Sequence, residues 1–155
     1  MKAIYMICLL CLVNFCPAQA TSPERQALWK EYKKVIAIMN IEDYDTAIVV
    51  LDNFMKRDLS AYPDIHVSAL MTKVFCQLDM NLPDSADQNI DEIELFINRH
   101  ALDSLKPKLF RLKGQVYLRK SDFNAALDGQ LIGLRIAERV GIEIMEMGLS
   151  YDIGC

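Results

Sequence analysis

The sequence is short of glycine, proline and histidine, and each shortage narrows what the chain can be. Six glycines and five prolines among 155 residues form no Gly-rich phosphate-binding loop, and they suit long helices joined by short connections. The two histidines, His66 and His100, have no cysteine or carboxylate partner at metal-ligand spacing on one helix. We therefore expect no metal site and no cofactor, with both histidines at the surface or satisfied by neighbours.

Groups that could carry catalysis are also scarce. The segment 148–152 half resembles the turn that presents a hydrolase nucleophile, but it lacks the final glycine, so Ser150 is not expected to be a nucleophile. Asp91, Glu92 and Glu94 lie close together, and a solvated helix face accounts for them better than an acid/base pair. We expect that the chain is not an enzyme, with an enzyme on a helical scaffold as the minor alternative.

No stripe of positive charge runs along the sequence. The formal net charge is −4, and charged residues make up 25% of the chain. Because phosphate binding needs clustered lysine and arginine, we expect no nucleic-acid partner. The hydrophobic content of 52% is that of a folded globular protein with a core.

The first 20 residues have the pattern of a secretory signal peptide. Lys2 is followed by an apolar run over 3–15, and 18–20 (AQA) supplies the small residues that signal peptidase reads. The run is about 13 residues, which is short for a bilayer-spanning helix of about 20. We expect cleavage after Ala20 and export to the periplasm or cell envelope. An uncleaved membrane anchor and a lipoprotein signal ending at Cys16 are the alternatives.

Two of the five cysteines remain once residues 1–20 are removed. In an oxidising compartment Cys76 and Cys155 could pair within one chain or between chains. Two free thiols, one buried and one near the chain end, are the favoured interpretation.

An internal repeat with a period near 40 organises the rest of the chain. The segment 43–48 (DYDTAI) resembles 122–127 (DFNAAL), and a middle copy between them places Ala47, Ala86 and Ala126 at intervals of 39 and 40. Glycines share this phase, since Gly154 lies 40 residues after Gly114.

Each period is predicted to form two antiparallel helices, because apolar residues recur at helical spacing on both sides of a short turn. Pro23 follows the capping residue Ser22, and Gly141 stops the last complete pair. The expected fold is an all-α solenoid of stacked helix pairs. The repeats are expected at about 23–60, 63–100, 103–141 and, in part, 142–155.

Small residues are expected where the paired helices cross closely. Gly114 on one helix and Ala126 on the next suit such a crossing, because a large side chain would force the helices apart. Tyr117 and Phe123 are expected to fill the space beside it. The repeat-packing positions are thus Ala47, Ala86, Gly114, Tyr117, Phe123, Ala126 and Gly154.

Residues 112–117 (LKGQVY), together with 122–127, resemble the tetratricopeptide repeat family. The resemblance covers most of 28–155 and is strongest in the third repeat. The first repeat has Val35 at the glycine position, and the middle repeat has Val74 there and Pro83 at the aromatic position. This family implies a binding module made of helix pairs, with ligands in the groove lined by the first helix of each repeat.

The junction 135–141 (RIAERVG), followed by 150–154 (SYDIG), is similar to repeats in the exported sensor halves of certain bacterial regulators. That resemblance implies the extracytoplasmic sensing or adaptor part of a signalling protein. Because the partial fourth repeat lacks its second helix, we expect part of a longer protein or a truncated product, with a last helix that caps the stack as the alternative. A stand-alone scaffold or assembly factor for envelope complexes is the alternative. We expect the protein to contact a membrane only through the signal or anchor, or through a further C-terminal segment.

Family groove positions carried onto this sequence place an apolar and aromatic end beside a basic end. Such a groove suits a protein or peptide partner with an acidic terminus. The alternative for Trp29 and Tyr32 is that they cover the open N-terminal end of the stack. The expected groove residues are Trp29, Tyr32, Ile36, Met71, Phe75, Lys108, Arg111, Gln115 and Tyr151.

Overall fold

The computed structural model describes residues 22–141, and this part of the chain is all-helical, with no strand. The expected all-α class is therefore confirmed. Tyr151, Gly154, Cys155 and the segments 1–20 and 142–155 lie outside the described residues. The helices are α2 (Pro23–Met39), α3 (Tyr44–Met55), α4 (Pro63–Asp79), α5 (Pro83–Arg99), the 3-10 helix η2 (Asp103–Leu105), α6 (Lys106–Arg119) and α7 (Phe123–Val140).

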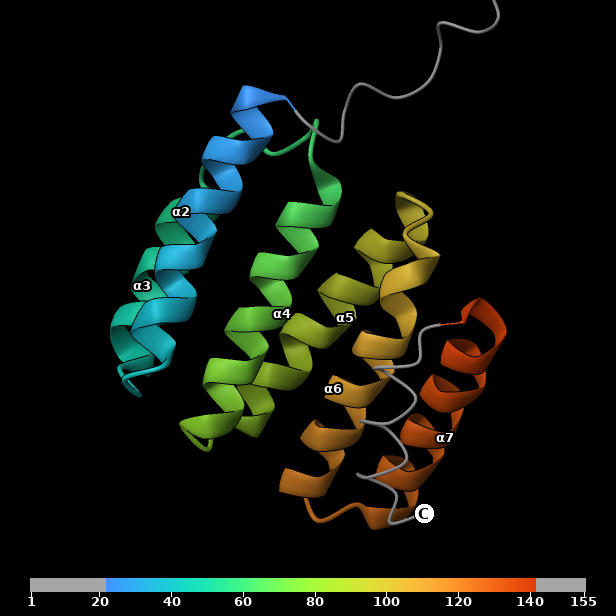
Figure 1. Ribbon diagram of the computed structural model, residues 1–155. Coiled ribbons are helices and arrows are strands. Elements are labelled where there is room, and N and C mark those ends of the chain that lie inside the picture. Colours follow the sequence, from blue (N-terminus) through green and yellow to red (C-terminus); the bar gives the residue numbers. More distant parts are fainter. Residues whose placement is uncertain (1–21, 142–155) are drawn as a thin grey trace, which may run out of the picture.

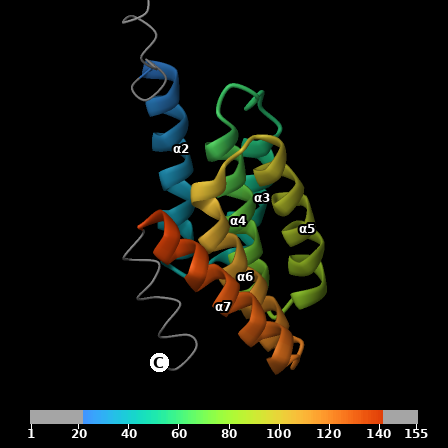
Figure 2. The same cartoon turned by 90° about the vertical axis from the view of Figure 1, so that its right-hand side faces the viewer.

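The helices cross the molecule in chain order and alternate in direction (Figure 1). A turned view separates two layers, with α2, α4 and α6 on one side and α3 and α5 on the other (Figure 2). In the first-helix layer (α2, α4 and α6), α4 packs against both α2 and α6. Each second helix (α3, α5 and α7) packs against the first helix of its own pair, and α3 and α5 also contact the next pair.

Local signals in the sequence explain where the helices begin. Ser22 caps α2 by accepting a hydrogen bond from the Arg25 N–H at 3.1 Å, and Pro23 occupies the first turn. Asp43 caps α3 and Asp122 caps α7 in the same way, at 3.2 and 3.1 Å. At the matching position before α5 stands Leu82, whose side chain makes no capping bond.

The turn inside each helix pair contains a residue in the left-handed conformation that is not glycine. These residues are Glu42, Asn81 and Ser121, with φ of 60°, 57° and 62°. They lie five residues before Ala47, Ala86 and Ala126, so the period of the turns is the period of the sequence repeat. Left-handed backbone costs about 1 kcal/mol or more outside glycine. Gly141, with φ of 70°, ends α7 without that cost.

The core consists of two hydrophobic clusters that meet at α4. One joins α4 to α2 and α3 and contains Ile65, Ala69 and Cys76, all fully buried. The other joins α4 to α5 and α6 through residues such as Val67 and Ile90. Helix α4 is therefore covered on two sides, whereas α2 contacts described helices on one side only.

Most of the expected repeat-packing positions lie inside the molecule. Ala47, Ala86 and Ala126 are buried. Gly114 is buried against α7, and a Cβ atom there would lie 2.7 Å from the Gln130 Cγ and 3.1 Å from the Ala126 carbonyl oxygen. Only glycine therefore fits this crossing without movement of a neighbour.

The expectation for Phe123 was wrong. Its side chain is 67% exposed and does not fill the space beside the Gly114–Ala126 crossing. Phe123 is the first residue of α7. Tyr44, the matching residue of α3, instead packs at the edge of the core. Tyr117 is half-buried.

Candidate ligand-binding groove

Two adjoining hollows lie between α4 and α6. The first is about 200 Å³ and brings together four expected groove residues, Phe75, Lys108, Arg111 and Gln115, beside Leu112. The second is about 340 Å³, and Phe75 and Gln115 line it too. The two hollows therefore form one continuous groove along the first-helix layer. The other residues of the second hollow are Leu78, Asp79, Leu118 and Arg119.

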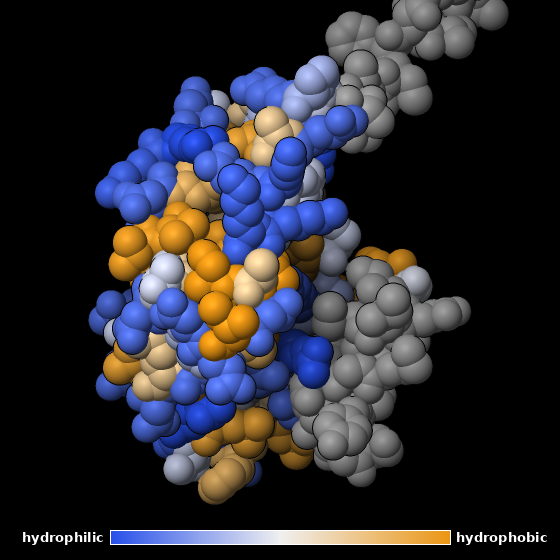
Figure 3. All heavy atoms as spheres, turned by 60° about the vertical axis from the view of Figure 1, so that its left-hand side comes forward, coloured by the Kyte–Doolittle hydropathy of each residue, from blue (hydrophilic) through white to orange (hydrophobic). Residues whose placement is uncertain are grey.

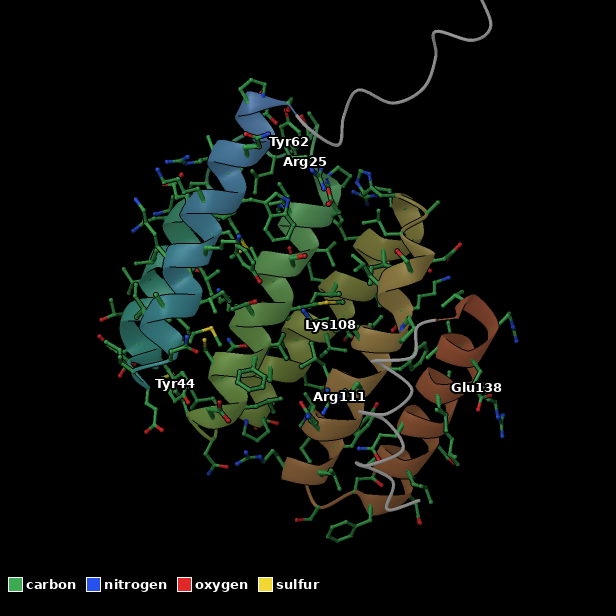
Figure 4. The ribbon with its side chains drawn as sticks, in the orientation of Figure 1. Arg25, Tyr44, Tyr62, Lys108, Arg111 and Glu138 are labelled. Carbon is green, nitrogen blue, oxygen red and sulfur yellow. The ribbon has the colours of Figure 1, made fainter. Side chains whose placement is uncertain are left out.

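The groove combines an exposed aromatic ring with basic side chains. Phe75 is 42% exposed although it is large and apolar. Lys108 and Arg111 lie one turn apart on α6, on the side that faces α4 (Figure 4). Such a surface offers apolar contact at Phe75 directly beside hydrogen-bond donors for a carboxylate.

Lys108 differs from the other lysines of α6. Lys113 forms an ion pair with Glu94 at 3.0 Å, and Lys106 forms one with Asp103 at 2.7 Å. Lys108 has no ion-pair partner among residues 22–141, and burial lowers the pKa of its ammonium group. A carboxylate placed in the groove would supply the missing opposite charge and favour the protonated form of Lys108.

Four expected groove residues do not line the groove, and two of them, Met71 and Tyr32, are buried. Met71 is 1% exposed and belongs to the core between α4, α5 and α6. Tyr32 is 7% exposed, and its hydroxyl lies 2.6 Å from the Thr72 Oγ1. The family positions placed both in the groove, whereas here both side chains are buried between neighbouring helices, Tyr32 in the cluster of α2, α3 and α4 and Met71 in that of α4, α5 and α6.

The remaining predicted positions on α2 lie away from the α4–α6 groove. Ile36 packs at the edge of the core between α2, α3 and α4. Trp29 is half-buried and meets the Tyr32 ring edge-on, with ring centroids 5.3 Å apart. Trp29 and Tyr32 therefore act as a pair at the α2 end of the molecule.

The two layers carry opposite net charge, although the net charge of the whole chain is only −4. Helices α2, α4 and α6 hold ten basic and four acidic side chains, whereas α3 and α5 hold one basic and seven acidic ones. Helix α6 contributes five basic residues and no acidic one. The groove therefore lies in a positive layer of an acidic protein. Grouping the predicted helices by their order in each pair would have revealed this from the sequence.

The two histidines are engaged in ring packing. His66 stacks on Phe96 with ring centroids 4.7 Å apart, and Phe96 stacks on His100 at 4.3 Å. Burial lowers the pKa of the His66 imidazole, against a smaller raising effect of Glu92. Within 22–141, no three side chains of the His, Cys, Asp and Glu types are grouped as a metal site.

Cys76 is a free, fully buried thiol in the core between α2, α3 and α4. Burial raises its pKa to about 11, so the thiolate that reacts with disulfides and metals is not populated at neutral pH.

Comparison with known proteins adds no family to this picture. No protein-family model matches the chain, and neither the curated proteins nor the solved structures contain a match. Among the helices of residues 22–141, none has the length and apolar character required to cross a bilayer.

Proposed function

We propose that the chain is a non-catalytic binding module of the tetratricopeptide type, an α-solenoid whose α4–α6 groove holds an acidic segment of a protein partner. The observation that carries the proposal is the groove itself, where Lys108 and Arg111 lie beside the exposed Phe75 in the positive first-helix layer. An extended peptide with an apolar residue followed by carboxylates would fit this surface, because the apolar residue would contact Phe75 and the carboxylates would pair with Lys108 and Arg111.

The repeat geometry supports the choice of family. Val35, Val74 and Gly114 are buried at matching places on the three first helices. Ala47, Ala86 and Ala126 are likewise buried at matching places on the three second helices. Buried residues that recur at the same position of each repeat are typical of stacked helix pairs, where each pair packs against its neighbours in the same way.

We further propose that the module is exported and works in the periplasm or cell envelope. Ser22, the cap of α2, comes two residues after the expected cleavage site at Ala20. Cleavage there would therefore leave every helix of 22–141 intact. The role that fits best is the sensing or adaptor part of a signalling protein. The intact mass of the native product from fractionated cells distinguishes this from a short stand-alone scaffold.

Selection from a displayed library of random peptides tests the binding proposal. Protein lacking residues 1–20 would be immobilised, and the affinity of each selected peptide would be measured for the unmodified protein and for Lys108→Ala and Arg111→Ala. We expect acidic peptides whose affinity falls about tenfold in each variant, because a charge-assisted hydrogen bond is lost.

The matched control is Arg57→Ala, an exposed arginine beside α2 and α3 that is paired with Glu31 and does not line the groove. Its affinity should be unchanged. Selected peptides without acidic residues, or affinities that do not respond to Lys108 and Arg111, would contradict the proposal.

A further inference from the structure

Helix α2 presents a basic outer face that no described helix covers. Its lysines, Lys30, Lys33 and Lys34, are all exposed. A shallow hollow of about 520 Å³ along this face is lined by Arg25, Gln26, Trp29, Lys30 and Lys33. We call the five residues Gln26, Trp29, Lys30, Lys33 and Lys34 the α2 ridge. Figure 3 turns the α2–α3 pair towards the viewer, with hydrophilic side chains over its upper part and hydrophobic ones gathered across the middle.

The matching positions of α4 show that the ridge lies at an end of the helix stack. Val35 and Val74 correspond, so Lys30 corresponds to Ala69 and Lys33 to Thr72. Ala69 and Thr72 are buried, and α4 packs against α2 and α3. Where α4 has these two interface residues, α2 therefore has Lys30 and Lys33, and Lys34 matches Lys73, which pairs with Asp52.

The ridge has no acidic residue to balance its charge. The two carboxylates of α2 are engaged elsewhere, since Glu31 pairs with Arg57 and Glu24 accepts a hydrogen bond from the Tyr62 hydroxyl at 3.0 Å. Lysines on other helices mostly form ion pairs, as Lys113 does with Glu94. Lys30, Lys33 and Lys34 have no such partner within residues 22–141. A polar end of a stack requires only polarity, so three unpaired charges of one sign need a further explanation.

Trp29 adds an aromatic group to this positive surface. The ring is half-buried and held edge-on against Tyr32, so part of the indole remains at the surface among the lysines. Tryptophan and lysine together are typical of surfaces that lie at a membrane–water interface, where the ring sits at headgroup level and the ammonium groups meet lipid phosphates. All described lining of the hollow comes from one helix, so it offers no second wall to hold an extended peptide.

We propose that the α2 ridge docks the protein on an anionic lipid surface. The three lysines supply the electrostatic attraction, and Trp29 enters the headgroup region. This contact is separate from the α4–α6 groove, so a module docked through α2 keeps the groove open to its protein partner.

Vesicle binding tests the proposal directly, because Trp29 is the only tryptophan of the chain. Protein lacking residues 1–20 is suitable, since the buried cluster residues all lie between 28 and 116. It would be mixed with vesicles of phosphatidylcholine alone, or of phosphatidylcholine and phosphatidylglycerol in equal parts. We expect co-sedimentation with the mixed vesicles only, a blue shift of tryptophan emission and weakening with salt.

The deciding variant is the triple change Lys30→Glu, Lys33→Glu and Lys34→Glu. Each lysine near an anionic bilayer contributes about fivefold in partitioning, so binding should fall at least a hundredfold. The matched control carries the same change of charge at exposed sites on other elements, Lys56→Glu, Arg99→Glu and Arg135→Glu, and should retain most of the binding.

The pair Lys108→Glu and Arg111→Glu should leave vesicle binding nearly unchanged, which separates this proposal from that of the groove. Absence of binding to mixed vesicles, equal loss in the ridge variant and its matched control, or binding without a shift of Trp29 emission would overturn it. Circular dichroism of each variant checks that the helices are retained.

Discussion

The two ends of the helix stack are built from opposite kinds of side chain. On α2, the outward positions that match Ala69 and Cys76 of α4 are Lys30 and Ala37, both exposed. On α7, the most exposed large hydrophobic residue is Phe123, and Leu127 is also exposed. The same repeat thus ends in a polar face at one side and an apolar face at the other.

Position in the stack, more than the repeat pattern, therefore sets the surface chemistry of a helix. A face that meets water through its whole length can be lysine-rich, as α2 is. The apolar outer face of α7 has instead the composition of a surface that packs against another helix. The further helix expected from residue 142 onward lies outside the described residues.

The largest effect is expected from placing a lysine, as found on the outer face of α2, at a buried position of α4. We expect Cys76→Lys to destabilise the fold by roughly 3–5 kcal/mol, because it buries an unpaired charge in the core between α2, α3 and α4. Ala37→Lys, at the matching exposed position of α2, should change the free energy of unfolding by less than about 0.5 kcal/mol. Urea denaturation measures both, and similar losses would show that α2 is not an end of the stack.

A milder test compares matching positions on α3 and α7. Ile48 packs at the edge of the core, whereas Leu127 is exposed. We expect Ile48→Ala to cost about 1–2 kcal/mol and Leu127→Ala less than about 0.5 kcal/mol, because only the first loses buried contacts. Thermal and urea unfolding of the two variants would measure the difference. A cost at Leu127 equal to that at Ile48 would mean that the outer face of α7 is covered in solution.

The smallest expected effects lie at the crossing of α6 and α7. Gly114→Ala should destabilise by about 1 kcal/mol, because its Cβ would press on Gln130 and on the Ala126 carbonyl. Gly129→Ala should instead stabilise by about 0.5–1 kcal/mol, since its nearest neighbour would lie 3.6 Å away and alanine favours helix. Effects of the same sign in both variants would contradict the predicted close crossing at Gly114.

The sequence contained enough information to predict the helices but not all of their contacts. Pro23, Gly141 and the recurring alanines mark starts, stops and period, and the helices lie where these signals place them. The faces of Tyr32 and Met71 could not be assigned, because burial between neighbouring pairs depends on how the pairs stack. Phe123 was misplaced because it occupies the same repeat position as Tyr44, which packs at the edge of the core. No described helix pair follows α7, so Phe123 has no such neighbour.

Other features of the site were present in the sequence and were missed. The five basic residues of α6, with no acidic one, are legible without a structure. Their meaning depends on knowing that α2 and α6 share a layer, which contacts and not composition establish. The left-handed conformation of Glu42, Asn81 and Ser121 could not be predicted, because none of these residues is a glycine.

The opposite charge of the two layers gives the molecule a permanent dipole. Six net positive charges on one layer and six negative on the other, separated by a helix-packing distance of about 10 Å, amount to a few hundred debye. Within the screening length of about 8–10 Å, an acidic protein partner would rotate the protein before touching it. The first-helix layer, which holds the α4–α6 groove, would then face that partner, so orientation precedes contact and association slows as salt rises.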